Sequence, residues 1–133
     1  MKHRHIIIIV DDDADDREMM RDAFLNAGVE QEYIFFENGE TVLEYLQASL
    51  GKQLPSLILL DLNMPGKDGR ETLREIKADI NYQPVPIVVF TTSSSQRDRL
   101  MAYRLGANCF VSKPDTFDKL TNMSSCLAQL WLQ

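Results

Sequence analysis

The sequence contains little cysteine: Cys109 and Cys126 are the only two in 133 residues. Two thiols are too few for a disulfide framework, and neither lies in a CxxC or Cys/His pattern that would bind zinc. We therefore expect both to be small apolar fillers of a core. A chain of this length can bury a core for one domain without such cross-links, so we predict a single domain over residues 1–133.

Long apolar runs and clustered positive charge are also missing. No segment approaches the length of a membrane helix, and the first apolar stretch, Ile6 to Val10, meets three aspartates too soon to be a signal-peptide core. The net charge is -6 and the Lys and Arg residues are scattered, which argues against a nucleic-acid surface. We expect a cytoplasmic protein that binds neither a membrane nor nucleic acid.

The sequence does contain five short apolar runs, each followed by a segment with apolar residues at helical spacing. Continuous apolar runs of this length are typical of strands buried on both faces. Because parallel strands need helical crossovers, the alternation predicts an α/β fold with helices on both faces of a parallel sheet. The predicted strands are His5–Val10, Tyr33–Phe36, Leu57–Leu60, Pro86–Phe90 and Cys109–Val111, and the last helix runs from Phe117 to the chain end.

Polar side chains lie at the ends of four of these runs. Asp11 and Asp12 follow the first, Asp61 the third, Thr91 the fourth, and Lys113 comes shortly after the fifth. In open α/β sheets the ligand crevice lies beyond the carboxyl ends of the strands, so these residues are expected to meet there. Three adjacent carboxylates repel one another unless a cation lies among them, and an oxygen-seeking ion such as Mg²⁺ would do so.

A carboxylate beside such a metal can attack phosphorus, since aspartyl phosphates are known covalent intermediates. The metal and Lys113 would neutralise the phosphoryl oxygens, and the Thr91 hydroxyl could hydrogen-bond to one of them. The pattern therefore indicates phosphoryl transfer to Asp61.

Four segments around these residues resemble the receiver domain of two-component response regulators: VDDD, LLDLNMPGKDG, VVFTTSS and GANCFVSKP. The residues of these segments are most similar to those of small single-domain regulators that partner bacterial phytochromes. The resemblance implies a flavodoxin-like, doubly wound, five-stranded parallel sheet of order 2-1-3-4-5, with five helices in a three-layer α/β/α sandwich. It also implies a receiver domain without an effector domain.

The resemblance implies a role for each site residue. Asp61 would be the phosphorylated residue, and the Lys113–Pro114 peptide bond would be cis. A Mg²⁺ or Mn²⁺ ion would be held by Asp11, Asp12, Asp61 and the backbone carbonyl of Asn63. The phosphoryl-binding and switch residues would be Thr91, Thr92, Lys113 and Phe110, which lacks the hydroxyl of the commoner tyrosine.

The resemblance also implies partners. The phosphoryl donor would be a sensor histidine kinase or a histidine phosphotransfer protein. The face made by the fourth helix, the fifth strand and the last helix would then bind a downstream effector protein or a second copy of the chain. Such a protein catalyses only its own phosphorylation and dephosphorylation, so we do not expect an enzyme acting on metabolites.

Three other functions are weaker. A phosphatase of the haloacid dehalogenase type usually carries a second Asp two residues after the nucleophile, where this chain has Asn63. An FMN carrier of the same fold would need a phosphate-binding loop instead of the acidic Asp11 to Asp13. A degenerate receiver acting only as a binding module would lack an essential group, and none is missing. The neighbouring Asp13, Asp15 and Asp16 are interpreted as acids that cap a helix or stabilise its first turn.

Overall fold

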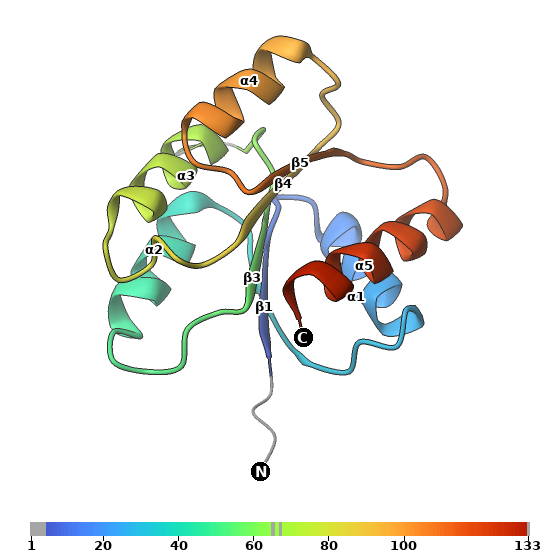
Figure 1. Ribbon diagram of the computed structural model, residues 1–133, viewed down its shortest axis with the longest axis horizontal. Helices are drawn as coiled ribbons and strands as arrows, with labels where there is room; N and C mark the ends of the chain where they lie inside the picture. The colour runs from blue at the N-terminus through green and yellow to red at the C-terminus, as the bar shows by residue number, and fades with distance from the viewer. Residues whose placement is uncertain (1–4, 65, 67, 133) are drawn as a thin grey trace.

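The structure is a computed structural model that describes residues 5–64, 66 and 68–132. In this part of the chain five strands and five helices alternate, as predicted (Figure 1). Pro65 and Lys67, which belong to one of the segments that resemble receiver domains, lie outside the described residues. The strands are β1 (Ile6–Val10), β2 (Glu32–Phe36), β3 (Leu57–Leu60), β4 (Ile87–Thr91) and β5 (Cys109–Ser112), and the helices are α1 (Ala14–Asn26), α2 (Gly39–Ala48), α3 (Gly69–Ala78), α4 (Gln96–Arg104) and α5 (Phe117–Trp131).

All the strand pairings are parallel, and the strand order is β2-β1-β3-β4-β5, which confirms the predicted order. At the carboxyl edge Val10 is in register with Phe36 and Leu60. Thr91 is in register with Ser112. The strands therefore end side by side, and the residues that follow them share one edge of the sheet.

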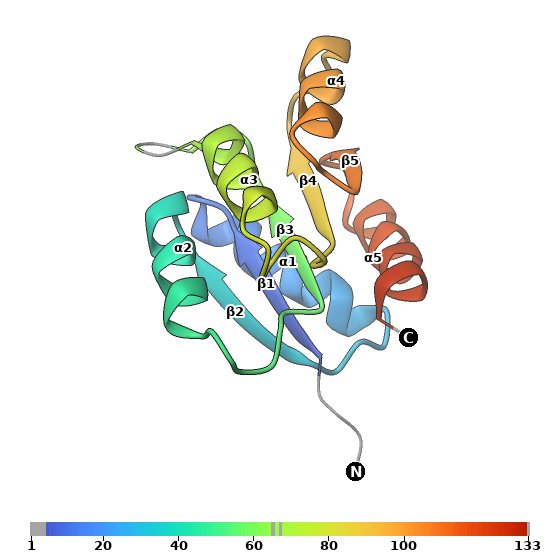
Figure 2. The ribbon, with the colours of Figure 1, turned by 60° about the vertical axis from the view of Figure 1, so that its left-hand side comes forward.

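The sheet is the middle of three layers (Figure 2). Side chains alternate between its faces, so Ile7 and Ile9 of β1 pack with α1 and α5 on one side, while Ile8 and Val10 pack with α2, α3 and α4 on the other. Every residue of β3 and β4 is buried, which explains why these strands are apolar except for Thr91 at the end of β4. The inner strands are thereby a rigid support for the residues at their ends.

Each helix begins at a residue whose side chain accepts a backbone N–H of the first turn. Asp13 caps α1, as predicted, and Ser95 caps α4. Asn38 caps α2, and Gly39 is the first residue of that helix. No helix in the described part of the chain combines the length and the apolar character needed to cross a membrane.

The prediction that both cysteines fill the core is wrong for Cys126. Cys109 is half-buried, but Cys126 lies on the exposed side of α5. The buried residues of that helix are Leu120, Ser124 and Leu127. These follow a helical stripe that leaves position 126 outside, and the Ser124 hydroxyl is accommodated because it donates to the Leu120 carbonyl.

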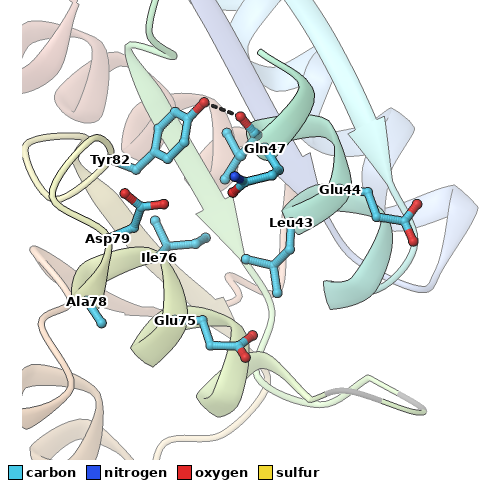
Figure 3. A pocket seen from close by; sticks show the side chains of 9 residues that line it. Leu43, Glu44, Gln47, Glu75, Ile76, Ala78, Asp79 and Tyr82 are labelled. Carbon is cyan, nitrogen blue, oxygen red and sulfur yellow. Dashed lines mark hydrogen bonds between the residues drawn. The ribbon is translucent and has the colours of Figure 1, made fainter. Parts of the chain in front are cut away.

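A groove runs between α2 and α3 (Figure 3). At one end the Tyr82 hydroxyl donates a hydrogen bond to the Leu46 carbonyl, which ties the loop after α3 to α2. No predicted site residue is among the described residues that line the groove, which are Leu43, Glu44, Leu46, Gln47, Glu75, Ile76, Ala78, Asp79 and Tyr82.

Candidate functional site

The residues expected to form a site do lie at the shared carboxyl edge of the sheet. Asp11 and Asp61 directly follow β1 and β3, Thr91 is the last residue of β4, and Lys113 directly follows β5. Backbone bonds continue the sheet to these residues: the Asp61 N–H donates to the Val10 carbonyl at 3.0 Å and the Lys113 N–H to the Thr91 carbonyl at 2.7 Å. Their positions are therefore fixed by the core strands.

Asp11, Asp12 and Asp61 form a compact group of carboxylates. One oxygen of each lies within 4.8 Å of the others. Asp11 and Asp61 are only 3% and 6% exposed, while Asp12 faces solvent. A group of hard oxygen donors, two of them buried and one open to water, fits a divalent cation such as Mg²⁺ or Mn²⁺, which keeps part of its water shell.

Asp11 is oriented by contacts on both sides. Its Oδ1 accepts the Asp13 backbone N–H at 3.0 Å, and its Oδ2 accepts the Lys113 ammonium at 2.8 Å. The Arg17 guanidinium donates to the Asp11 backbone carbonyl at 2.7 Å. The turn between β1 and α1 is therefore closed by hydrogen bonds that hold the Asp11 carboxylate toward the sheet edge.

Lys113 lies among three carboxylates. Its Nζ is 2.8 Å from Asp11 Oδ2, 2.9 Å from Asp16 Oδ2 and 3.6 Å from Asp61 Oδ2. Burial alone would lower the pKa of this ammonium, but the hydrogen bonds to Asp11 and Asp16 and the nearby negative charges outweigh burial and raise it. Lys113 is therefore a permanent cation beside Asp61.

The two buried carboxyl groups, Asp11 and Asp61, are less stable in their charged form than an exposed aspartate. Burial raises the pKa of Asp61, and the attraction of Lys113 and the Asn63 backbone N–H offsets this only in part. Burial likewise raises the pKa of Asp11, against the hydrogen bond from Lys113. One lysine does not compensate this group of acids, so a second cation at the site would be electrostatically favourable.

Thr91 is the buried hydroxyl of the site. It is 0% exposed, and its Oγ1 accepts the Asn63 side-chain amide at 3.3 Å and the Ser93 N–H at 3.4 Å. Both bonds are long, and the Thr91 side chain also hydrogen-bonds to Asp61, which partly offsets the rise in the pKa of that carboxyl. Thr92, also predicted as a site residue, is exposed.

The loop that follows Thr91 is attached to α3 and α4 through one carboxylate. The Ser93 hydroxyl donates to Asp98 Oδ2 at 2.6 Å, and Arg70 pairs with Asp98 Oδ1 at 3.2 Å. The Ser93 hydroxyl is the main reason that the pKa of Asp98 is lowered, with Arg70 adding to it. Sequence reasoning missed this link, since Arg70 and Asp98 look like ordinary surface charges.

Phe110 is buried at 4% exposure and packs in the core on the side of the sheet that α2, α3 and α4 cover. The Arg99 guanidinium stands over the ring at 5.1 Å from its centroid, and the Phe110 N–H donates to the Tyr103 hydroxyl at 3.1 Å. Both contacts come from α4, so the position of Phe110 is coupled to that helix.

Two expectations about the site were wrong or incomplete. The described residues contain no cis peptide bond, so Lys113–Pro114 is trans, the isomer that X–Pro bonds favour by about 0.5–1 kcal/mol. Asp16 does more than stabilise a first helical turn, because it pairs with Lys113. Their partnership could not be read locally, since 97 residues separate them.

Gly69 is a further residue that sequence reasoning missed. Its N–H donates to the Leu62 carbonyl at 3.1 Å, so α3 begins directly against the backbone that carries Asp61. A Cβ at this position would lie 2.2 Å from the Asp61 carbonyl oxygen and 2.6 Å from Leu62 Cα. The close approach requires glycine, although its position after Asp68 gave no sign of it.

Comparisons with known proteins agree with this site. The family model described as the response regulator receiver domain matches residues 7–125. The response regulator Rcp1 of Synechocystis is 33% identical over 131 residues, which cover 96% of this chain and 89% of Rcp1. The DNA-binding transcriptional regulator NtrC of Escherichia coli is 34% identical over 116 residues, which are 87% of this chain and 23% of NtrC.

Solved structures agree as well. The phosphorylated cyanobacterial phytochrome response regulator RcpA has a TM-score of 0.88 at 33% identity, with 98% of this chain and 96% of that chain covered. The Mn²⁺-bound form of Rcp1 has a TM-score of 0.84 at 32% identity, with 97% and 95% covered. With the strand order and the acidic edge already described, these matches lead to one conclusion: the chain belongs to the response regulator receiver domain family and has the phosphorylation-activated role of such domains in two-component signalling.

Proposed function

We propose that Asp61 is the residue that accepts the phosphoryl group. The observation that carries this proposal is the position of its buried carboxylate, 3.6 Å from the Lys113 ammonium and within 4.8 Å of the carboxylates of Asp11 and Asp12. An Asp61 oxygen would form a bond to phosphorus while the bond from phosphorus to the donor's imidazole nitrogen breaks. The electron pair stays with the imidazole, which is then free to take up a proton.

The proposed metal ligands are Asp11, Asp12, Asp61 and the Asn63 backbone carbonyl. A bound Mg²⁺ or Mn²⁺ would supply positive charge for the phosphoryl oxygens. Rcp1 has been solved with Mn²⁺, which supports this choice of ion for a related chain. The raised pKa values of Asp11 and Asp61 support it independently, since both carboxylates need compensation when ionised.

Lys113, Thr91, Thr92 and Phe110 are proposed to respond to the new group. Lys113 is close enough to Asp61 to neutralise a phosphoryl oxygen with little movement. Thr91 can turn its hydroxyl toward the phosphoryl group by giving up two long hydrogen bonds, and the exposed Thr92 would follow in the same loop. Phe110 would transmit the change, because α4 contacts both its ring and its backbone.

Receiver domains interact with histidine kinases or phosphotransfer proteins and with effectors, and this chain belongs to that family. We propose a sensor histidine kinase or a histidine phosphotransfer protein as the donor. A phytochrome-type kinase is the first candidate, because RcpA is described as a phytochrome response regulator. The proposed output surface is the face of α4, β5 and α5, where Leu100 and Tyr103 are exposed. It would bind an effector protein or a second copy.

We propose that residues 1–133 act as one receiver domain with no effector domain among them, in the cytoplasm. The protein would catalyse only its own phosphorylation and dephosphorylation. A receiver that binds partners without phosphorylation is not favoured, since the acids, the hydroxyl and the lysine all converge on one edge of the sheet.

The test is the intact mass of the protein after incubation with acetyl phosphate and Mg²⁺. We expect the wild type to gain one phosphoryl group, and we expect no gain with EDTA or in Asp61→Asn. Asp118→Asn, which removes an exposed carboxylate from the first turn of α5, is the matched control and should be phosphorylated normally. A folded wild type that gains no mass, or an Asp61→Asn variant that gains it, would refute the assignment.

A further inference from the structure

Lys113 is bound by Asp16, a residue to which the proposed phosphorylation site assigns no other role. An ammonium group carries three N–H donors. Two are directed to Asp11 at 2.8 Å and Asp16 at 2.9 Å, and the next carboxylate oxygen, on Asp61, is 3.6 Å away. Two short contacts therefore determine the direction in which the remaining donor points.

Asp16 is not needed as a helix cap. Asp13 occupies that position, and its carboxylate accepts the backbone N–H groups of both Asp15 and Asp16. Asp15 and Asp16 stand side by side in the first turn of α1, but within the described residues Lys113 forms ion pairs with Asp11, Asp16 and Asp61. Asp15 is exposed, so the two neighbours separate the effect of a charge in the first turn from the effect of the contact with Lys113.

Asp16 also lies outside the acidic group that fits a cation. Asp11 has two uses, since it belongs to that group and also holds Lys113. Any interaction of Asp11 with a cation weakens its hold on the ammonium, because both compete for the same carboxylate. Asp16 is free of that conflict and remains available to Lys113 in either situation.

A second position for the Lys113 side chain lies next to the one that it occupies. A cavity of about 50 Å³ is lined by Asp16, Phe90, Lys113 and Pro114, among others. The Phe90 ring centroid is 5.8 Å from the Lys113 Nζ, within the range in which a ring attracts a cation. Without Asp16 the ammonium could turn toward this ring and away from Asp61.

We propose that Asp16 is a positioning residue for phosphorylation. It acts through Lys113: together with Asp11 it fixes two ammonium donors, so that the third faces the Asp61 carboxylate where the phosphoryl group is transferred. The inference rests on the proposed function of Asp61 and adds a residue that keeps Lys113 aligned when Asp11 is engaged with a cation.

The kinetic test measures phosphorylation against acetyl phosphate concentration at saturating Mg²⁺. Asp16→Ala should lower the maximal rate about threefold to tenfold, because a misaligned charged donor stabilises the transferring group less well. The concentration for half-maximal rate should stay the same or fall, since a negative charge that repels the anionic donor has been removed. Asp16→Asn keeps an oxygen acceptor and should recover most of the rate, and Asp15→Ala should match the wild type.

A second readout needs neither metal nor phosphate. In a nitrogen-15 correlation spectrum of the lysine ammonium groups, the Lys113 signal should be visible in the wild type and broaden or disappear in Asp16→Ala. Lys77, whose ammonium donates to the carbonyls of Gln83 and Val85, provides an internal reference in every variant.

The outcomes are separable. If the wild type is phosphorylated and Asp16→Ala reaches the same or a higher maximal rate, the positioning role is overturned. An unchanged Lys113 signal in Asp16→Ala also overturns it, whatever the kinetics. If the wild type is not phosphorylated at all, the proposed function fails, while the ammonium spectrum still reports whether Asp16 anchors Lys113.

Discussion

The site has two halves that are built differently. The acidic half consists of Asp11, Asp12 and Asp61, which follow β1 and β3. The hydroxyl half consists of Thr91 at the end of β4, Ser93 in the following loop and Asp98 in the first turn of α4. In the acidic half, backbone bonds of the sheet hold Asp11 and Asp61, and contacts of 2.8 and 3.0 Å hold the Asp11 carboxylate. In the hydroxyl half, Thr91 is held by bonds of 3.3 and 3.4 Å, and a single carboxylate ties the loop to two helices.

The difference separates chemistry from signalling. The acidic half is rigid and carries unfavourable repulsion, which a cation or a phosphoryl-bound metal relieves. In the hydroxyl half the bonds from Asn63 and Ser93 to the Thr91 hydroxyl are long, so this side chain can turn when a new anion arrives. A switch needs both properties, and here they belong to different strands.

The largest loss of stability is expected from a substitution that crowds the backbone of the acidic half. In Gly69→Ala the new Cβ would meet backbone atoms of Asp61 and Leu62 at 2.2 and 2.6 Å, and backbone cannot move aside easily. We expect a loss of about 3 kcal/mol in the free energy of unfolding, measured by urea denaturation.

Gly28→Ala is the matched control for that variant. Gly28 has a φ of 88°, which strains an alanine, but its Cβ would meet nothing within 4 Å. A cost of about 1 kcal/mol is expected from the backbone alone. Equal losses in the two variants would show that the close approach at Gly69 is not what matters.

The second prediction is a gain of stability, in the variant Asp61→Asn. Burial raises the pKa of Asp61 above 3.8, so ionising this carboxylate opposes folding once the pH rises through the folded pKa. Without metal at neutral pH, Asp61→Asn should therefore be more stable than the wild type by about 1 kcal/mol. The advantage should vanish below pH 3.8, where the carboxyl is protonated in both folded and unfolded chains.

With Mg²⁺ bound, the wild type should become more stable than Asp61→Asn. A ligand that binds only the folded state stabilises it, so Mg²⁺ should raise the unfolding free energy of the wild type and leave Asp61→Asn nearly unchanged. Thermal denaturation with and without Mg²⁺ measures this. A wild type that is already the more stable protein without metal would contradict the repulsion assigned to the acidic half.

The smallest effect belongs to the hydroxyl half. The pKa of Asp98 is lowered by Ser93 and Arg70, so its stabilising contribution is complete above 3.8 and is lost as the pH falls through the folded pKa. Asp98→Asn should cost at most about 1 kcal/mol at neutral pH, since the group is partly exposed. The deficit should shrink in acid, and a deficit independent of pH would argue against the charged link.

The sequence predicted those features that local patterns determine. Apolar runs marked the strands, and the polar residues directly after them marked the site, because parallel strands bring their ends together. Asp11, Asp61, Thr91 and Lys113 could thus be grouped from four separate segments. The strand order came from the resemblance to receiver domains, and the structure confirms it.

The features that sequence reasoning missed depend on tertiary contacts. Asp16 looked like any acid in a first helical turn until α1 placed it beside Lys113. The approach of Gly69 to the Asp61 backbone depends on how α3 returns to the sheet. Cys126 was assigned by residue type, although its position on α5 decides its exposure, and the cis peptide at Pro114 had no support in the local residues.

The pairing of Asp11 with Lys113 across 102 residues also has a consequence during synthesis. Ribosomes add about 5–20 residues per second, so Asp11 emerges roughly 5–20 seconds before the lysine that neutralises it. During that interval the nascent chain holds its acids without their partner. β5, which delivers Lys113, is also the last of the five strands to be synthesised, so the ability to accept a phosphoryl group arises only after this strand has emerged.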